Sequence, residues 1–264
     1  MKTTEIKSLF IDTTQSQRKI RILLPEDYVT SSRKYPVLYM HDGQNLFDDK
    51  TSYSSQSWGI SKTISDLVEK KAIQDLIVVG IDNSDLRLFE YSPWKSSSIV
   101  KNISNIEVGG LGDIYADFVV NKVKPFIDNT YRTMPDYEHS MIAGSSMGAY
   151  ISAYIAIKYP NLFHYVGIFS IASWFNEDAF LEFLESSNID INQKFFISIG
   201  SHETSDASIR EFNEIYLENS RNLLSLLKSK QVLDVLYIET DDIHDESAWK
   251  KVFVDFIRFA SKTK

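Results

Sequence analysis

Residues 139–150 read HSMIAGSSMGAY and contain the pattern Gly-x-Ser-x-Gly at Gly144, Ser146 and Gly148. The apolar run before the pattern predicts a buried strand, and the Ala-, Ile- and Tyr-rich segment from about Met147 predicts a helix after it. Between them the backbone must reverse within about one residue, which would leave the Ser146 hydroxyl exposed on a strained turn. The two glycines avoid collisions with the neighbouring strand and helix. The stretch therefore predicts a nucleophilic serine at the end of a central strand.

Strand and helix patterns alternate along the rest of the chain. Two β-rich runs at 5–12 and 17–24 predict an antiparallel hairpin. Later strands are predicted at 35–40, 75–81, 165–170, 194–200 and 235–239, and helices at 58–70, 114–127, 177–186, 209–230 and 247–260. This alternation is typical of the α/β class, with a mostly parallel, twisted sheet of about eight strands and helices on both faces. Because no linker, repeat or low-complexity tract interrupts it, residues 1–264 are predicted to form a single domain.

Composition narrows the classes of function. The chain has 264 residues, is 43% apolar, and carries a net charge of −8 without a basic stripe, which argues against a nucleic-acid partner. The absence of cysteine excludes disulfides, thiolate metal sites and cysteine catalysis. The N-terminus is polar, and no apolar run approaches the roughly 18 residues of a membrane span. We therefore expect a cytoplasmic protein without a membrane partner; the oligomeric state cannot be read from the sequence.

A serine hydroxyl needs a base within hydrogen-bond reach before it can attack a carbonyl. In this architecture the acid and then the histidine follow the serine, each after a later strand. His244 lies after the last predicted strand and is the candidate base. Glu203, just past the strand at 194–200, is the preferred acid, with Asp206 as its competitor and a Ser-His dyad without a fixed acid as a third possibility.

The developing oxyanion needs two N–H donors. The backbone N–H of Met147, directly after the serine, is predicted to supply one. The loop after the strand at 35–40 is predicted to supply the other from Gly43 or Gln44. An ordinary turn explains the glycine at position 43 nearly as well as a close approach to substrate.

Two further features flank the predicted site. Residues 82–111 show little periodicity, which in a compact domain is typical of a lid, a binding loop or a disordered segment. Within this loop, Arg87 and Glu90 are interpreted as an ion pair that braces it, or Arg87 as a contact for an anionic substrate. Trp174 follows a strand end and is predicted to be a wall of the substrate pocket.

Several motifs together resemble the putative esterase family of α/β-hydrolases. They are LYMHDGQNLF at 38–47, VGI at 79–81, Arg87 with Glu90-Tyr91 and Pro93-Trp94, Tyr131-Arg-Thr133, GSSMG at 144–148, Ser173-Trp174 and HDESAW at 244–249. That family includes siderophore, feruloyl and acetylxylan esterases, S-formylglutathione hydrolase and the mycolyltransferases, and the similarity extends over about residues 15–260. The resemblance implies an α/β-hydrolase fold with Ser146 as nucleophile, His244 as base and Glu203 as acid. It also implies a substrate floor near Trp174 and the 82–111 loop.

Together, these features predict a serine carboxylic ester hydrolase that acts on a small-molecule ester through an acyl-enzyme. No metal or organic cofactor is expected. Acyl transfer on the same triad and a non-catalytic binding protein with the same fold are the alternatives. The joint presence of Ser146 and His244 argues against the second. Nothing in the sequence names the ester.

Overall fold

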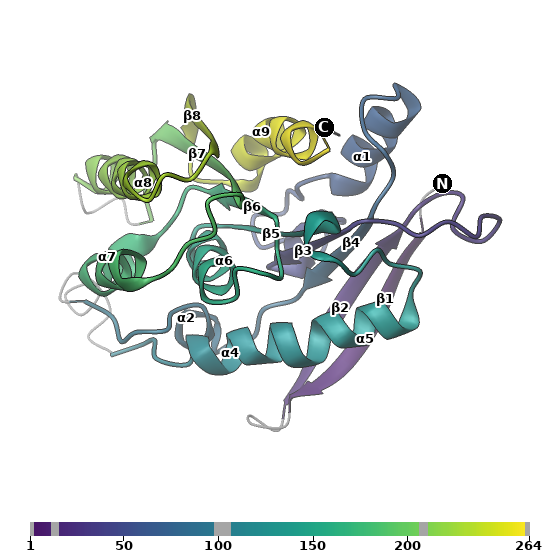
Figure 1. The fold of residues 1–264 in the computed structure, drawn as a ribbon, viewed down its shortest axis with the longest axis horizontal. Coiled ribbons are helices and arrows are strands. Elements are labelled where there is room, and N and C mark those ends of the chain that lie inside the picture. Colours follow the sequence, from purple (N-terminus) through teal and green to yellow (C-terminus); the bar gives the residue numbers. More distant parts are fainter. Residues whose placement is uncertain (1–2, 12–15, 98–106, 206–210, 262–264) are drawn as a thin grey trace.

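The computed structural model describes residues 3–11, 16–97, 107–205 and 211–261. Their strands form one eight-stranded sheet in the order β1-β2-β4-β3-β5-β6-β7-β8 (Figure 1). β1 pairs antiparallel with β2, β2 pairs antiparallel with β4, and all other pairs are parallel. The strands are β1 (Thr3–Ile11), β2 (Ser16–Leu24), β3 (Val37–His41), β4 (Ile77–Ile81), β5 (Ser140–Ser145), β6 (Tyr165–Phe169), β7 (Lys194–His202) and β8 (Asp234–Ile243). The predicted mostly parallel sheet with an N-terminal hairpin is confirmed.

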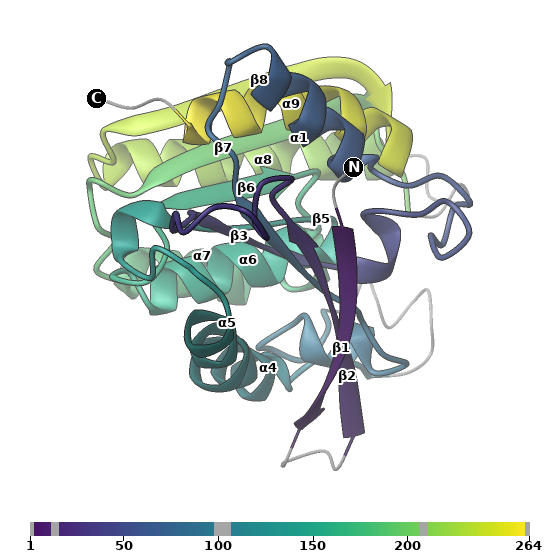
Figure 2. The same cartoon turned by 90° about the vertical axis from the view of Figure 1, so that its right-hand side faces the viewer.

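Helices cover both faces of this sheet because its central strands are apolar on both sides. Successive side chains of a strand point to opposite faces. In β3, Val37 and Tyr39 accordingly join the core under one set of helices, and Leu38 and Met40 join the core under the other. One face carries α1 (Ile60–Glu69) and α9 (Glu246–Ala260), and the opposite face carries α4 (Gly112–Phe118), α5 (Lys124–Thr130), α6 (Met147–Lys158) and α8 (Phe212–Ser229) (Figure 2).

Helix bounds follow the sequence pattern with two informative differences. The predicted helix at 114–127 is a longer helical segment in which a π-helical stretch, Val119–Val123, separates α4 from α5. Pro125 lies in the first turn of α5 and has no N–H to donate, so the regular α-helical bonding pattern cannot continue through this point. The aperiodic loop contains one short helix, α2 (Arg87–Glu90), and its residues 98–106 lie outside the described segments. α7 (Glu177–Ser186) has the predicted bounds.

The carboxyl ends of β5, β6, β7 and β8 lie side by side, since these strands are consecutive neighbours in the sheet. Ser146, Ser170, Glu203 and His244 follow or end these strands and therefore gather at one edge. In open α/β sheets this is the edge at which ligands bind. None of the helices in the described segments combines the length and apolar character that a membrane crossing requires.

Candidate active site

Ser146 occupies the turn between β5 and α6. Its backbone has φ 56° and ψ −124°, an uncommon conformation for a residue with a side chain. The Ser146 N–H donates to the Phe169 carbonyl at 2.9 Å, which ties the turn to β6. A Cβ atom on Gly144 would lie 2.5 Å from the carbonyl carbon of Gly148, so the close approach of strand and helix requires glycine there. The local geometry agrees with the predicted strand–turn–helix and leaves Ser146 partly exposed.

Glu203 and His244 are brought together from the ends of β7 and β8. A β-bulge between Gly200 and His202 interrupts the β7–β8 register just before Glu203. His244 Nδ1 forms a short hydrogen bond with Glu203 Oε2, and the two side chains are 11% and 1% exposed. When Nδ1 carries the proton of this bond, Nε2 presents a lone pair that can accept another proton. Asp206, the competing acid, lies outside the described residues.

Tyr216 of α8 touches both the serine and the histidine. Its ring centroid lies 4.9 Å from that of His244, and its hydroxyl is 2.6 Å from Ser205 Oγ. Burial raises the pKa of Tyr216 to about 12, although the polar side chains of Ser205, Trp174 and Ser146 near its hydroxyl act to lower it. The sequence alone does not mark Tyr216 as a site residue, because its position in the 3.6-residue pattern of the helix indicates only that it faces the core.

Arg87 and Glu90 do not pair with each other, so the interpretation of an ion pair between them is wrong. Arg87 binds Asp42 through two bonds of 2.8 Å, while Glu90 binds the buried Arg18 at 2.7 Å. Both residues lie in the single turn of α2, but the Arg87 guanidinium points toward Asp42 and the Glu90 carboxylate points toward Arg18.

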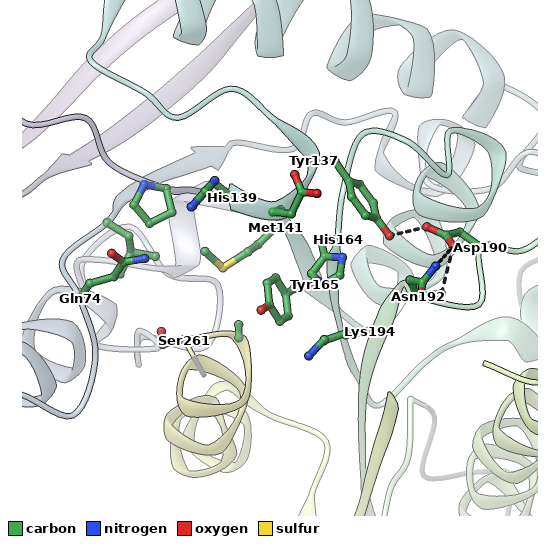
Figure 3. Close-up of a pocket in the computed structure, with 14 residues that line it drawn as sticks. Gln74, Tyr137, His139, Met141, His164, Tyr165, Asp190, Asn192, Lys194 and Ser261 are labelled. Atoms are coloured by element: carbon green, nitrogen blue, oxygen red, sulfur yellow. Dashed lines mark hydrogen bonds between the residues drawn. The ribbon is translucent and has the colours of Figure 1, made fainter. Parts of the chain in front are cut away.

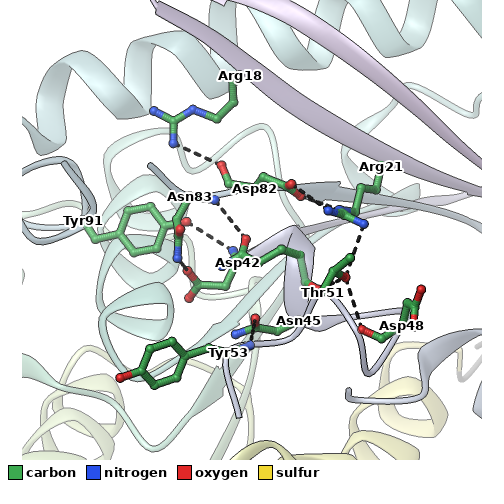
Figure 4. Close-up of polar contacts among 11 residues, drawn as sticks. Arg18, Arg21, Asp42, Asn45, Asp48, Thr51, Tyr53, Asp82, Asn83 and Tyr91 are labelled. Atoms are coloured by element: carbon green, nitrogen blue, oxygen red, sulfur yellow. Dashed lines mark hydrogen bonds and ion pairs between the residues drawn. The ribbon is translucent and has the colours of Figure 1, made fainter. Parts of the chain in front are cut away.

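Asp42, the first residue after β3, is held by its partners in an ionised state. Burial would raise the pKa of Asp42, but the charge of Arg87 and hydrogen bonds from Arg87 and Asn83 outweigh it and lower the pKa. The Asn83 side chain donates to Asp42 Oδ1 at 2.6 Å (Figure 4). The guanidinium of Arg87 also lies 5.1 Å from the centre of the Tyr91 ring. With these contacts Arg87 fixes the loop after β3, and its contact with substrate stays a prediction.

Gly43 is required by packing against β4. A Cβ atom there would lie 2.5 Å from the carbonyl carbon of Gly80. Gln44 is anchored as well, since its side-chain Oε1 accepts the Asn83 N–H at 3.1 Å. Met147 is the first residue of α6, where the N–H groups of a helix have no intrahelical acceptor. The donor roles of Met147, Gly43 and Gln44 stay predictions.

His41, the residue before this loop, is a buried neutral side chain. Burial lowers its pKa to about 3, with Asp42 raising it and Arg87 lowering it further. Its Nδ1 lies 2.8 Å from the Tyr115 hydroxyl. It is therefore part of the support beneath the loop.

Trp174 lies in a short 3₁₀ turn after β6 and is 9% exposed. Its ring centroid is 4.8 Å from that of Phe212 and 6.1 Å from that of Tyr216. The aperiodic loop reaches the same turn, because the Ser97 N–H donates to the Phe175 carbonyl at 2.8 Å. The structure thus brings Trp174 and the 82–111 loop together; a role in substrate binding stays a prediction for Trp174.

A separate cavity of about 430 Å³ opens at the opposite, amino edge of the sheet (Figure 3). Tyr137, His164, Tyr165 and Lys194 are among the side chains that line it. It lies near the starts of β5, β6 and β7, far from the turn at Ser146. Within the described parts of the chain, no group of three or more His, Asp or Glu side chains is arranged to hold a metal ion.

Comparison with known proteins gives a family and a fold. The model of the family described as "Putative esterase" matches residues 11–259. The "Uncharacterized protein YbbA" of Bacillus subtilis (strain 168) is 24% identical over 246 residues, which cover 92% of each chain.

Solved structures show the same fold at low sequence identity. The enterobactin esterase FES from Shigella flexneri, solved in the presence of enterobactin, is 14% identical with a TM-score of 0.75, and the match covers 98% of this chain and 58% of FES. The ferulic acid esterase AmCE1/Fae1A from Anaeromyces mucronatus, solved in complex with ferulic acid, is 20% identical with a TM-score of 0.66 and coverage of 98% and 92%. The predicted α/β-hydrolase fold is confirmed.

Proposed function

Because this chain belongs to the "Putative esterase" family and is a carboxylesterase-type hydrolase, we propose that Ser146, His244 and Glu203 form its catalytic triad. The observation that carries the proposal is the hydrogen bond between the buried Glu203 carboxylate and His244 Nδ1. This bond arises at the sheet edge that also carries the strained turn of Ser146.

In this mechanism His244 Nε2 takes the proton of the Ser146 hydroxyl while Oγ attacks the ester carbonyl. The resulting imidazolium is stabilised by the negative charge of Glu203. His244 then protonates the leaving alcohol, and an acyl-enzyme on Ser146 remains. Water, deprotonated by the same imidazole, attacks the acyl-enzyme and releases the acid.

The tetrahedral oxyanion would be held by the Met147 N–H and by a backbone N–H of Gly43 or Gln44. Support for this assignment comes from the rigidity of the loop after β3, since Asp42, Gln44 and Gly43 are all fixed by neighbours. Preorganised donors stabilise developing charge without reorganising during the reaction.

The proposed substrate is a small-molecule carboxylic ester. Two structures of the same fold were solved with enterobactin and with ferulic acid, respectively. A substrate panel should therefore include a siderophore trilactone, a feruloyl sugar and short acyl esters.

Hydrolysis of p-nitrophenyl acetate and butyrate by purified variants tests the triad. Ser146→Ala should lower kcat by at least about 10³-fold, because the nucleophile is lost. Glu203→Gln should lower kcat strongly, whereas Asp206→Asn is the matched control and should leave it nearly unchanged. Hydrolysis that survives in Ser146→Ala would disprove the mechanism. The same assays with added alcohols measure acyl transfer, which would appear as ester product at the expense of free acid.

A further inference from the structure

We propose that Ser170 and Trp249 are positioning residues that orient the Glu203 carboxylate through a hydrogen-bond relay, an inference that rests on the proposed triad. The relay runs from the Trp249 indole N–H to Ser170 Oγ at 2.9 Å, and from the Ser170 hydroxyl to Glu203 Oε1 at 2.5 Å. All three residues are buried, at 6%, 2% and 1% exposure for Trp249, Ser170 and Glu203.

The chemistry of the groups fixes the direction of the relay. An indole N–H can only donate, and an ionised carboxylate can only accept. Ser170 Oγ accepts from Trp249, so its single proton is directed at Glu203 Oε1. Because Ser170 is buried, a hydroxyl held at both ends in this way has one orientation that satisfies both hydrogen bonds.

The two carboxylate oxygens of Glu203 have different hydrogen-bond partners. Oε1 accepts the Ser170 hydroxyl and the Gly200 N–H, the latter at 2.8 Å, while Oε2 faces His244. A buried carboxylate needs such donors, because burial without hydrogen bonds costs free energy. With Oε1 bound on one side, rotation of the carboxyl group away from His244 would break two hydrogen bonds.

The backbone conformation of Ser170 supports a functional role for its hydroxyl. Ser170 directly follows β6 and has φ 48°, a left-handed conformation that glycine would adopt without strain. Its N–H donates to the Ser198 carbonyl at 2.8 Å, so the strained residue is tied to β7. Strained residues of this kind cluster at functional sites. Glycine would avoid this strain, but it has no hydroxyl to donate to Glu203, as Ser170 does.

Trp249 acts on the histidine as well. Its ring meets His244 edge-on, with centroids 5.0 Å apart and planes at 86°. One side chain of α9 therefore packs against the base and, through Ser170, orients the acid. Trp58 offers a matched control, because it is also buried and its ring lies 5.7 Å from that of Trp249, on the side of α1.

Steady-state hydrolysis of p-nitrophenyl butyrate by Ser170→Ala, Ser170→Gly and Trp249→Phe tests the relay. Both Ser170 variants should lose about ten- to a hundredfold in kcat with little change in KM, the range expected for one hydrogen bond to a charged group. Alanine at position 170 would be strained at this positive φ and could lower the folded fraction. Ser170→Gly also removes the hydroxyl but relieves the strain, so it tests the relay even if Ser170→Ala folds poorly. Trp249→Phe retains the ring beside His244 and should lose less. Trp58→Phe should keep the wild-type kcat.

The distinguishing measurement is a double-mutant cycle with Glu203→Gln, read from the rate at which a fluorophosphonate labels Ser146. If Ser170 acts through Glu203, Ser170→Ala should have almost no further effect in the Glu203→Gln background. Equal losses in both backgrounds would show a merely structural role and overturn the relay. So would wild-type kcat in Ser170→Gly. Full activity in Glu203→Gln would overturn both the triad and the relay. If Ser146→Ala and Glu203→Gln are inactive but Ser170→Ala is fully active, the relay alone is overturned.

Discussion

At the scale of single residues, the site depends on side chains that sit beside the proposed triad. Tyr216 packs its ring against His244 and places its hydroxyl among Ser146, Ser205 and Trp174. The ring limits the orientations of the imidazole, and the hydroxyl offers a polar partner to the serine before substrate arrives. These two contributions are separable by mutation.

Tyr216→Phe should keep the packing on His244 and lose only the hydroxyl, so we expect kcat to fall less than about tenfold. Tyr216→Leu removes the ring contact too and should lower kcat by more than about tenfold, because the base is then less well oriented. Initial rates on p-nitrophenyl esters, corrected for the folded fraction by circular dichroism, measure both. A wild-type rate in Tyr216→Leu would show that the ring does not position the histidine.

At the scale of elements, the loop after β3 is held by the short helix α2. The link is the Arg87–Asp42 pair, in which the side chains are 27% and 8% exposed. Asp42 itself has the left-handed φ of 55°, so the pair stabilises a strained backbone next to Gly43 and Gln44. Removal of one partner from such a pair leaves a nearly buried charge without compensation.

Arg87→Met should lower the free energy of unfolding by about 2 kcal/mol at pH 7, below the range for fully buried pairs because Arg87 is partly exposed. In the wild type Arg87 helps to keep the pKa of Asp42 below its ordinary value, so this stabilisation is present above about pH 4 and is lost as the pH falls. In the variant, Arg87 no longer opposes the effect of burial on the pKa of Asp42, so less stability is lost as the pH falls. The difference between the two proteins should therefore shrink from pH 7 to pH 4 in urea unfolding curves.

Arg33→Met is the control for this experiment. Arg33 pairs with Asp27 on the surface, with the side chains 64% and 38% exposed, and exposed pairs contribute little. Its unfolding curve should match that of the wild type at both pH values. A difference between wild type and Arg87→Met that grows in acid would contradict the account of Asp42.

At the scale of the whole molecule, buried ion pairs attach the antiparallel edge of the sheet to the site. Arg18 of β2 binds both oxygens of Glu90 in α2, at 2.7 and 2.8 Å. Arg21 of β2 binds Asp82 at 2.7 Å, at the start of the long loop (Figure 4). The N-terminal hairpin thereby supports the segment that holds Asp42.

Arg18→Met should cost about 3–5 kcal/mol of stability, because Glu90 would remain buried and charged without its partner. The double variant Arg18→Met/Glu90→Met should be more stable than Arg18→Met alone, since neither charge is then left buried. Chemical unfolding of the two single variants and the double variant measures the coupling. Additive losses of stability in the double variant would contradict a direct interaction between Arg18 and Glu90. Lys62 forms an exposed pair with Asp66, so Lys62→Met is the control and should leave the free energy of unfolding nearly unchanged.

The sequence by itself determined the features that depend on neighbouring residues. Glycines at 144 and 148 around Ser146 indicate the strand–turn–helix, and at Gly144 a side chain would collide with the backbone of Gly148. The alternation of strand and helix segments along the chain indicates the mostly parallel sheet. The ends of strands also pointed to Glu203 and His244 as residues of one edge. In the folded chain Glu203 and His244, which are 41 positions apart in the sequence, form a hydrogen bond at that edge.

Only the tertiary structure decided which distant side chains meet. The Arg87–Glu90 interpretation failed because proximity in sequence favours a local pair, whereas folding gave Glu90 a buried partner 72 positions away. The predicted strand at 235–239 extends to Ile243 because pairing with β7 continues past the bulge. Trp249 and Ser170, which are 79 positions apart, meet only because α9 packs beside the ends of β6 and β7. Local periodicity records which face of an element is buried, but partners across the core are chosen by packing and hydrogen bonding in three dimensions.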